Sequence, residues 1–307
     1  MDNKTFLAYK VRIQQVAILA VGAAILGFLQ NSPTYAQPSG LSNRTKAFTD
    51  PAQMTGRETN DPAELARSWA AAMVQIPNKN GGSRISSIAA LRSSIGNTGA
   101  KYPTIIYLHG CSGFWKGTRE RVKFYADQGY LVIAPASFAR LKYPQSCNPA
   151  TKTGGLYRGT LAMRQADAGY AIEMVRKFPF VDQTKIILAG LSQGAITTAT
   201  FKAANRNQKT TARIIEGWTC NARWPEYRGI NAGPEEAVLT LVAKYDPWFQ
   251  NEWTKGDCGK FLTPDNGSIS VVYNKGKLAY QHELLKYSPV RKRVLDFLET
   301  LSGPNRR

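Results

Sequence analysis

Short runs of branched apolar residues alternate along this chain with longer segments of helical character. The runs lie at 104–108, 131–136, 186–189, 212–216, 237–243 and 268–273. They are rich in Val and Ile, which is typical of strands buried on both faces. Segments with helical patterns lie at 119–128, 158–177, 195–204 and 289–301. Strands that alternate with helices predict an α/β fold, with a mostly parallel central sheet and helices on both faces.

One junction between a predicted strand and a helix has the pattern G-x-S-x-G. The segment Gly190-Leu-Ser-Gln-Gly194 follows the apolar run at 185–189 and precedes the helix predicted at 195–204. In that context the pattern is typical of a nucleophile elbow, a sharp turn that exposes a reactive serine. The glycines leave room where a Cβ atom would collide with the neighbouring strand or helix. We therefore predict that Ser192 is a nucleophile at the carboxyl end of its strand, where open α/β sheets place their sites.

A serine nucleophile needs a base, and the base needs an acid that orients it. The chain has two histidines, His109 and His282. In α/β-hydrolases the order along the chain is serine, acid, histidine, which His282 satisfies and His109 does not. Asp246 follows Ser192 and lies just past the strand predicted at 237–243, whereas later aspartates lie further from a strand end. The predicted triad is therefore Ser192, Asp246 and His282.

Acyl transfer to serine also needs backbone donors for the negative charge that develops on the substrate oxygen. One predicted donor is the N–H of Gln193, directly after the nucleophile. The other belongs to the loop after the strand at 104–108, where we predict Cys111, with Ser112 as the alternative. His109 stands at the same strand end, where we expect it to shape this loop rather than to transfer a proton.

Aromatic residues follow several predicted strand ends and are candidates for a substrate pocket. They are Phe114, Trp115, Phe138, Trp248, Phe249 and Trp253. We assign His109, Ser112, Trp115 and Trp248 to the pocket, and packing within the loops is the alternative role for the aromatic side chains. The stretch 143–155 contains paired glycines and is predicted to be a mobile cover.

Taken together, these motifs resemble the α/β-hydrolase superfamily and, within it, the branch of dienelactone hydrolases and polyhydroxybutyrate-depolymerase-like esterases. The resemblance is carried by Leu108-His-Gly-Cys-Ser-Gly113, Val181-Asp182, the elbow at 190–194, Tyr245-Asp246 and His282. It extends over about residues 103–301 and implies an α/β-hydrolase fold and ester hydrolysis. Dienelactone hydrolases themselves carry cysteine as the nucleophile, whereas this chain has Ser192.

The predicted function is that of a serine hydrolase that cleaves carboxylic esters, either small molecules or esters derived from polymers, through an acyl-enzyme. A serine peptidase or acyltransferase on the same scaffold is the alternative, as is a hydrolase-like binding protein without activity. The presence of all three triad residues disfavours the binding protein. We predict no cofactor, and no metal site, because the chain has no C-x-x-C motif and only two histidines.

The start of the chain has the pattern of a secretory signal peptide. Lys4, Lys10 and Arg12 precede an uncharged apolar stretch at 16–29, and a small residue, Ala36, ends the segment that follows. A basic, then apolar, then small-residue order predicts export to the periplasm or the medium, with cleavage after Ala36. A helix of fourteen residues would span ~21 Å, short of a hydrocarbon core of ~30 Å, so an uncleaved anchor is only the alternative.

The remaining residues divide into a leader and one domain. Residues 37–60 are polar and rich in Pro, Ser and Thr, which predicts a flexible leader. Residues 61–307 are predicted to form a single α/β-hydrolase domain. Its first segment, 62–76, has helical character, and 78–83 is a turn, whereas no early strands can be identified.

Four cysteines in an exported chain predict two disulfides, for which three pairings exist. Cys111 and Cys147 follow predicted neighbouring strands, as do Cys220 and Cys258. The members of each pair should therefore lie near the same edge of the sheet. The predicted disulfides are Cys111–Cys147 and Cys220–Cys258.

The formal net charge is +19, and removal of residues 1–36, which hold three basic residues and one acidic residue, lowers it to +17. The basic residues are dispersed and no nucleic-acid-binding motif is present, so we predict no specific binding to nucleic acid. Such a charge favours weak, salt-sensitive association with anionic envelope surfaces.

Overall fold

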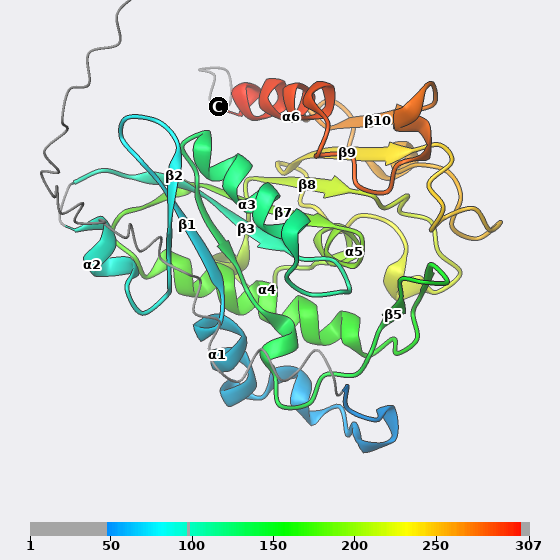
Figure 1. Ribbon diagram of the computed structural model, residues 1–307, viewed down its shortest axis with the longest axis horizontal. Coiled ribbons are helices and arrows are strands. Elements are labelled where there is room, and N and C mark those ends of the chain that lie inside the picture. The colour runs from blue at the N-terminus through cyan, green and yellow to red at the C-terminus, as the bar shows by residue number, and fades with distance from the viewer. Residues whose placement is uncertain (1–47, 97–98, 302–307) are drawn as a thin grey trace, which may run out of the picture. The chain divides into compact units, whose positions relative to one another are not determined.

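The computed structural model describes residues 48–96 and 99–301. The signal peptide predicted at 1–36 and the first part of the leader lie outside these residues. The described chain forms a large sheet with helices on both faces (Figure 1). None of the described helices has the length and apolar character needed to cross a membrane.

The sheet has eight strands within the described residues, in the spatial order β10-β9-β8-β7-β3-β4-β1-β2. Their bounds are β1 Met73–Pro77, β2 Ser83–Ser86, β3 Tyr102–Leu108, β4 Leu131–Ala134, β7 Val181–Leu191, β8 Ala212–Glu216, β9 Ala237–Ala243 and β10 Ile269–Tyr273. The strands from β10 to β4 pair in parallel, and β1 is antiparallel to both β4 and β2. This mostly parallel sheet, with the elbow between β7 and α5, confirms the predicted α/β-hydrolase fold.

Both faces of the sheet are covered by helices. The helices are α1 Pro62–Ala70, α2 Leu91–Ile95, α3 Lys116–Asp127, α4 Thr160–Arg176, α5 Gln193–Thr200 and α6 Ser288–Thr300. Successive side chains of a strand point to opposite faces, so Ile105 of β3 joins a core with α3 and α6 and Ile106 joins a core with α4. In Figure 1, α3 and α6 accordingly lie on one side of the sheet, and α4 lies on the other.

The helix predicted at 62–76 is too long. The Asp61 side chain caps α1 by accepting a hydrogen bond from the Ala63 N–H, and the helix ends at Ala70. The residues that follow form β1, in which every residue is buried because the strand lies between β4 and β2. Its apolar residues continue the helical pattern only by coincidence, and pairing with distant strands decides their conformation. The turn predicted at 78–83 connects β1 to β2, although its last residue, Ser83, already belongs to β2.

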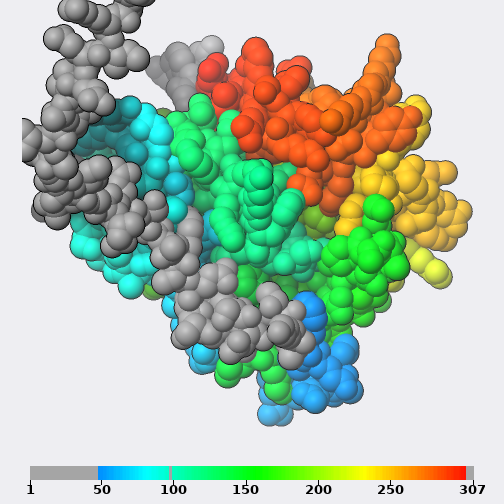
Figure 2. All heavy atoms as spheres, in the orientation of Figure 1, coloured from blue at the N-terminus to red at the C-terminus, as the bar shows by residue number. Residues whose placement is uncertain are grey.

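The described end of the predicted leader is attached to the domain. Residues 48–60 contain two short 3-10 helices, η2 Pro51–Gln53 and η3 Arg57–Asn60. The buried Arg140 guanidinium donates to the carbonyl of Glu58 at 2.5 Å, and the Thr49 N–H donates to the carbonyl of Tyr143 at 3.3 Å. Figure 2 shows part of this segment, in blue, next to atoms coloured green.

Candidate active site

Ser192 occupies the turn between β7 and α5. Its backbone has φ 58° and ψ −119°, a left-handed conformation that costs free energy for a residue other than glycine. The flanking glycines make the turn sterically feasible, as predicted. A Cβ atom on Gly190 would lie 2.5 Å from the backbone of Gly194, and one on Gly194 would lie 2.0 Å from the Leu108 carbonyl oxygen. The sequence around Ser192 therefore allows a turn that other residue types would prevent.

His282 and Asp246 form a hydrogen-bonded pair. The Nδ1 atom of His282 lies 2.7 Å from Oδ2 of Asp246, whose carboxylate is buried and also accepts from the Trp248 N–H at 3.0 Å. With its Nδ1 proton donated to the carboxylate, the neutral imidazole has an acceptor at Nε2. This Nε2 atom is buried and has no hydrogen-bond partner among the described residues. Such an imidazole is oriented and able to accept a proton.

Ser192 and His282 both lie close to the end of β8. The Ser192 N–H donates to the Glu216 carbonyl at 2.9 Å. The next residue, Gly217, has φ 65°, and a Cβ atom there would lie 2.8 Å from the His282 carbonyl oxygen and 3.2 Å from its ring carbon Cε1. Ser192 thus contacts Glu216, and His282 lies against the adjacent Gly217, where a side chain would collide with the histidine.

A cavity of about 440 Å³ opens beside this serine. Ser192, Gln193 and Cys111 are among its lining residues, so both predicted oxyanion donors belong to residues at the cavity. Gln193 is the first residue of α5, where the backbone N–H has no acceptor within the helix. The N–H is therefore free to stabilise negative charge near Ser192, and the partial positive charge of the helix N-terminus adds to this effect.

Only one of the four residues assigned to the pocket lines this cavity. Trp248 does so, and its ring stacks on the imidazole of His282 at 5.3 Å between centroids. Ser112 is exposed outside the lining, and Trp115 packs against Gly117 at the start of α3 and against the core. Phe249 and Trp253, which the sequence offered as further aromatic candidates, also line the cavity.

His109 lies beneath the active site instead of lining its cavity. It is 1% exposed, its Nδ1–H donates to the Gly110 carbonyl at 2.6 Å, and the rings of Phe114 and Phe138 pack edge-on against it. Burial, together with the nearby Arg164 guanidinium, lowers the pKa of His109 well below its usual value of 6.5. A neutral, enclosed imidazole supports the loop that carries Cys111, in line with the structural role expected for it.

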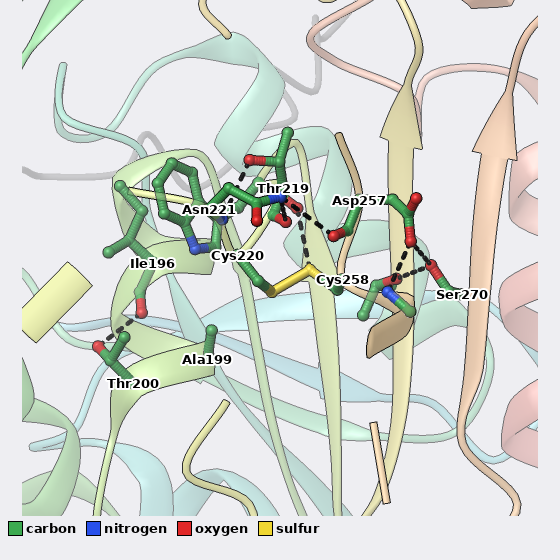
Figure 3. The surroundings of a disulfide bond; sticks show 12 residues. Ile196, Ala199, Thr200, Thr219, Cys220, Asn221, Asp257, Cys258 and Ser270 are labelled. Atoms are coloured by element: carbon green, nitrogen blue, oxygen red, sulfur yellow. Dashed lines mark hydrogen bonds between the residues drawn. A yellow bond between two sulfur atoms is a disulfide. The ribbon is translucent and has the colours of Figure 1, made fainter. Parts of the chain in front are cut away.

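Both predicted disulfides are present. Cys111–Cys147 has a Cα–Cα distance of 6.0 Å and lines the cavity, and Cys220–Cys258 has a distance of 5.0 Å and ties the loop after β8 to the loop after β9 (Figure 3). Near the first of these, the Ser146 hydroxyl donates to the side-chain oxygen of Gln193 at 2.9 Å. The disulfides thus restrain loops on the side of the sheet where the strands end.

The segment predicted as a cover, 143–155, contains a small hairpin of β5 (Cys147–Asn148) and β6 (Thr153–Gly154). Gly154 and Gly155 line the cavity, and a Cβ atom on Gly155 would lie 2.4 Å from the ring of Trp224. The glycine therefore lets the hairpin lie directly on this indole ring. One wall of the cavity is formed in this way.

The model of the dienelactone hydrolase family matches residues 91–254, more than half of the chain. The chain belongs to the dienelactone hydrolase family. The match includes Ser192 and Asp246 and ends before His282. No curated protein matches the chain.

Several solved structures are similar to this dienelactone hydrolase family member. A putative dienelactone hydrolase from Klebsiella pneumoniae subsp. pneumoniae is 18% identical, with a TM-score of 0.49 over 66% of this chain and 89% of the other. A dienelactone hydrolase-like promiscuous phosphotriesterase from metagenomic libraries is 17% identical, with a TM-score of 0.46 over 74% and 98%. Esterase 2 of Thermogutta terrifontis is 13% identical, with a TM-score of 0.43 over 75% and 89%.

One residue of the site in this family member was missed by the sequence analysis. The guanidinium of Arg164, 1% exposed in α4, donates to the side-chain oxygen of Gln193 at 2.9 Å and to the carbonyl of His109. It therefore connects the elbow to the loop of Cys111, the two sources of predicted oxyanion donors. Its helix buries a largely apolar stripe beside the buried Thr160 and Asp167, and an arginine within that stripe is the signal that would have identified it. The stripe consists of Leu161, Arg164, Ala168, Ala171 and Val175.

Within the described residues, no group of three or more His, Cys, Asp or Glu side chains is arranged to hold a metal ion.

Proposed function

We propose that this protein is an exported serine hydrolase that cleaves carboxylic esters through an acyl-enzyme, with Ser192 as nucleophile, His282 as base and Asp246 as the residue that orients the base. The observation that carries the proposal is the His282–Asp246 hydrogen bond of 2.7 Å, which leaves a buried Nε2 without a partner at the strand edge that holds the strained Ser192. Membership in the dienelactone hydrolase family supports hydrolysis as the reaction class.

In this mechanism His282 Nε2 accepts the proton of the Ser192 hydroxyl as Oγ attacks the carbonyl carbon of the ester. Negative charge develops on the carbonyl oxygen, where the N–H groups of Gln193 and Cys111 stabilise it. Collapse of the tetrahedral intermediate breaks the bond to the alcohol oxygen, which takes the proton from His282. Water then attacks the acyl-enzyme with His282 again as base, which releases the acid and restores Ser192. Asp246 keeps the ring oriented and stabilises the imidazolium in both steps.

Export is part of the proposal. The signal-peptide pattern at 1–36 and two disulfides within the domain support an oxidising compartment, since disulfides are rare in the cytosol. The net positive charge favours weak association with anionic envelope surfaces, which salt would screen.

Labelling with a fluorophosphonate probe tests the nucleophile. The wild-type protein should be labelled and should hydrolyse p-nitrophenyl esters, whereas Ser192→Ala should lose both properties and keep its fold, because it lacks only the attacking oxygen. His282→Ala should reduce kcat by several orders of magnitude. Ser93→Ala is a matched control, because Ser93 is exposed on α2 outside the cavity lining and should leave labelling unchanged. Undiminished labelling of Ser192→Ala would reject the assignment, and turnover of peptides in preference to esters would favour the peptidase.

A further inference from the structure

The walls of the active-site cavity are unusually rich in aromatic rings. Four of the six tryptophans of the chain are among its lining residues, together with one phenylalanine and one tyrosine. These residues are Trp218, Trp224, Tyr227, Trp248, Phe249 and Trp253. The cavity volume of about 440 Å³ is within the range of ~300–1,000 Å³ typical of small-molecule sites. The cavity is therefore large enough for a ring-sized substrate.

Neighbouring residues contact three of these rings. Trp248 stacks on His282, so an aromatic wall continues to the proposed base. Trp224 lies against Gly155 and has the Arg158 guanidinium 5.0 Å from the ring. Trp253 is 51% exposed and has the Arg223 guanidinium 5.4 Å from its ring. Rigid indole rings stack with planar groups in offset or edge-to-face arrangements, and such pairs contribute beyond the burial of apolar area.

The charged residues that line the cavity are all basic. Lys152 and Arg223 line the cavity, and no Asp or Glu is among the described lining residues. Neither cation forms an ion pair with another described residue, whereas the neighbouring Arg158 is paired with Glu226. Both Lys152 and Arg223 are exposed, while Ser192 is 7% exposed, so the free positive charge belongs to the open part of the lining.

Two lining residues also carry buried polar atoms without a partner. The indole N–H of Trp218 and the hydroxyl of Thr254 have no hydrogen-bond partner among the described residues. A buried donor left unpaired costs free energy. An acceptor oxygen supplied by a bound molecule would satisfy either donor.

We propose that this cavity takes esters that combine an aromatic ring with a carboxylate, the ring held between the tryptophans and the carboxylate held by Arg223 and Lys152. The proposal rests on the ester hydrolase function proposed above. It adds a substrate class, because a neutral aliphatic ester would leave the two unpaired cations and the aromatic walls without matching groups.

Four methyl esters of similar size separate the two parts of the proposal. Monomethyl terephthalate has the ring and the carboxylate, methyl benzoate lacks the charge, methyl 4-(trimethylammonio)benzoate reverses it, and monomethyl trans-cyclohexane-1,4-dicarboxylate keeps the charge without the planar ring. Each kcat/KM is divided by the rate constant for hydroxide hydrolysis of the same ester, so that intrinsic reactivity cancels. The corrected kcat/KM of monomethyl terephthalate should exceed that of methyl benzoate about tenfold, because each solvent-screened cation should raise it about threefold to fivefold.

Variants of the lining residues then test the assignment. Arg223→Gln and Lys152→Gln should each reduce the preference for monomethyl terephthalate over methyl benzoate by about threefold to fivefold, and high salt should reduce it in the wild type. Trp253→Leu should reduce the preference for the planar ring over the cyclohexane ring. Arg119→Gln is the control for net charge, because Arg119 is exposed on α3 outside the cavity lining and should leave both ratios unchanged.

The outcomes distinguish this proposal from the function on which it rests. If the corrected kcat/KM values of monomethyl terephthalate and methyl benzoate are equal, the carboxylate assignment is overturned while ester hydrolysis stands. The same conclusion follows if their ratio is unchanged in both Gln variants. If the corrected kcat/KM values of monomethyl terephthalate and the cyclohexane ester are equal, the proposal that the tryptophans hold an aromatic ring is overturned. If no ester is cleaved and Ser192 is not labelled, the proposed function itself fails.

Discussion

The two histidines of this chain have opposite surroundings, and the difference determines what each can do. His282 has a carboxylate at Nδ1 and no partner at Nε2 among the described residues, the arrangement of a general base. His109 is enclosed by Phe114 and Phe138, with its Nδ1–H donated to a backbone carbonyl. Burial keeps His109 neutral, and this lowers the free energy of unfolding at low pH.

His109 should make the fold less stable in acid. Its pKa is lowered by burial in the folded protein and is about 6.5 in the unfolded chain, so below that pH the unfolded state binds a proton that the folded state does not. Stability is therefore complete above pH 6.5 and falls by up to about 1.4 kcal/mol per pH unit below it, until the folded pKa is reached. In His109→Asn, which places an N–H near the position of Nδ1, urea unfolding at a series of pH values should show a smaller loss. An equal slope in both proteins would mean that other groups dominate.

Arg164 should act on kcat rather than on substrate binding. Its guanidinium donates hydrogen bonds to the Gln193 side chain and to the His109 carbonyl, so it positions both predicted oxyanion donors without contacting the substrate. Arg164→Met should lower kcat by roughly tenfold to a hundredfold with little change in KM, because misplaced donors stabilise the transition state less. Arg164→Lys should lower kcat less than Arg164→Met, because the ammonium keeps the positive charge. It should still lower kcat, because an ammonium cannot bridge both acceptors as a planar guanidinium does. Steady-state kinetics on p-nitrophenyl esters provide the measurement.

A second buried arginine gives the control for a purely structural effect. Arg140 pairs with Asp167 at 2.7 Å, and both are fully buried. The double variant Arg140→Met and Asp167→Leu removes the whole pair, which avoids an uncompensated buried charge. It should change the free energy of unfolding and leave kcat near the wild-type value. A raised KM with unchanged kcat in Arg164→Met would contradict the positioning role.

At the level of elements, the site depends on loops that leave the carboxyl ends of neighbouring strands. The loop after β3 carries Cys111, the elbow joins β7 to α5, and the loop after β9 carries Asp246. Parallel strands bring these loops to one edge, but loops are the most mobile part of such a fold. The two disulfides restrain them, one at the cavity and the other beside it.

The two disulfides should therefore have similar effects on stability and different effects on catalysis. They close loops of 36 and 38 residues, for which the chain-entropy model gives ~3 to 4 kcal/mol of stabilisation each. Cys111→Ser with Cys147→Ser should also lower kcat, because Cys111 is a predicted oxyanion donor. Cys220→Ser with Cys258→Ser should lower the melting temperature by a similar amount and leave kcat less affected. Equal kcat values in the two double variants would argue against an oxyanion role for the Cys111 loop.

For the whole molecule, the predicted compartment and the disulfides are linked. A chain exported through its N-terminal segment should lack residues 1–36, begin at Gln37 and have no free thiol. Expression of the full-length gene in a bacterial host, followed by intact-mass measurement and thiol alkylation without reductant, tests all three points. Recovery of a chain that begins at Met1 with four free thiols would reject export, although ester hydrolysis would be untouched.

The sequence alone determined the elements whose signals are local. The strands β8 and β9 have the predicted bounds, because each has branched apolar residues at its centre and every residue of both strands is buried. The elbow is equally local, since its glycines and serine are adjacent in the chain. The cysteine pairs were predictable because parallel strands place their ends at one edge, so the order of strands and helices was enough to group them.

Only the tertiary structure decided the features that depend on partners distant in sequence. Whether 73–77 continued a helix or formed β1 depended on pairing with β4 and β2. Which aromatic rings face the cavity depended on side-chain direction, which is why Trp115 packs in the core and Trp248 stacks on His282. Arg164 was hidden for the same reason: its two acceptors lie 29 and 55 residues away in sequence. A local sequence pattern predicts whether a residue is buried, whereas the tertiary structure determines which residues it contacts.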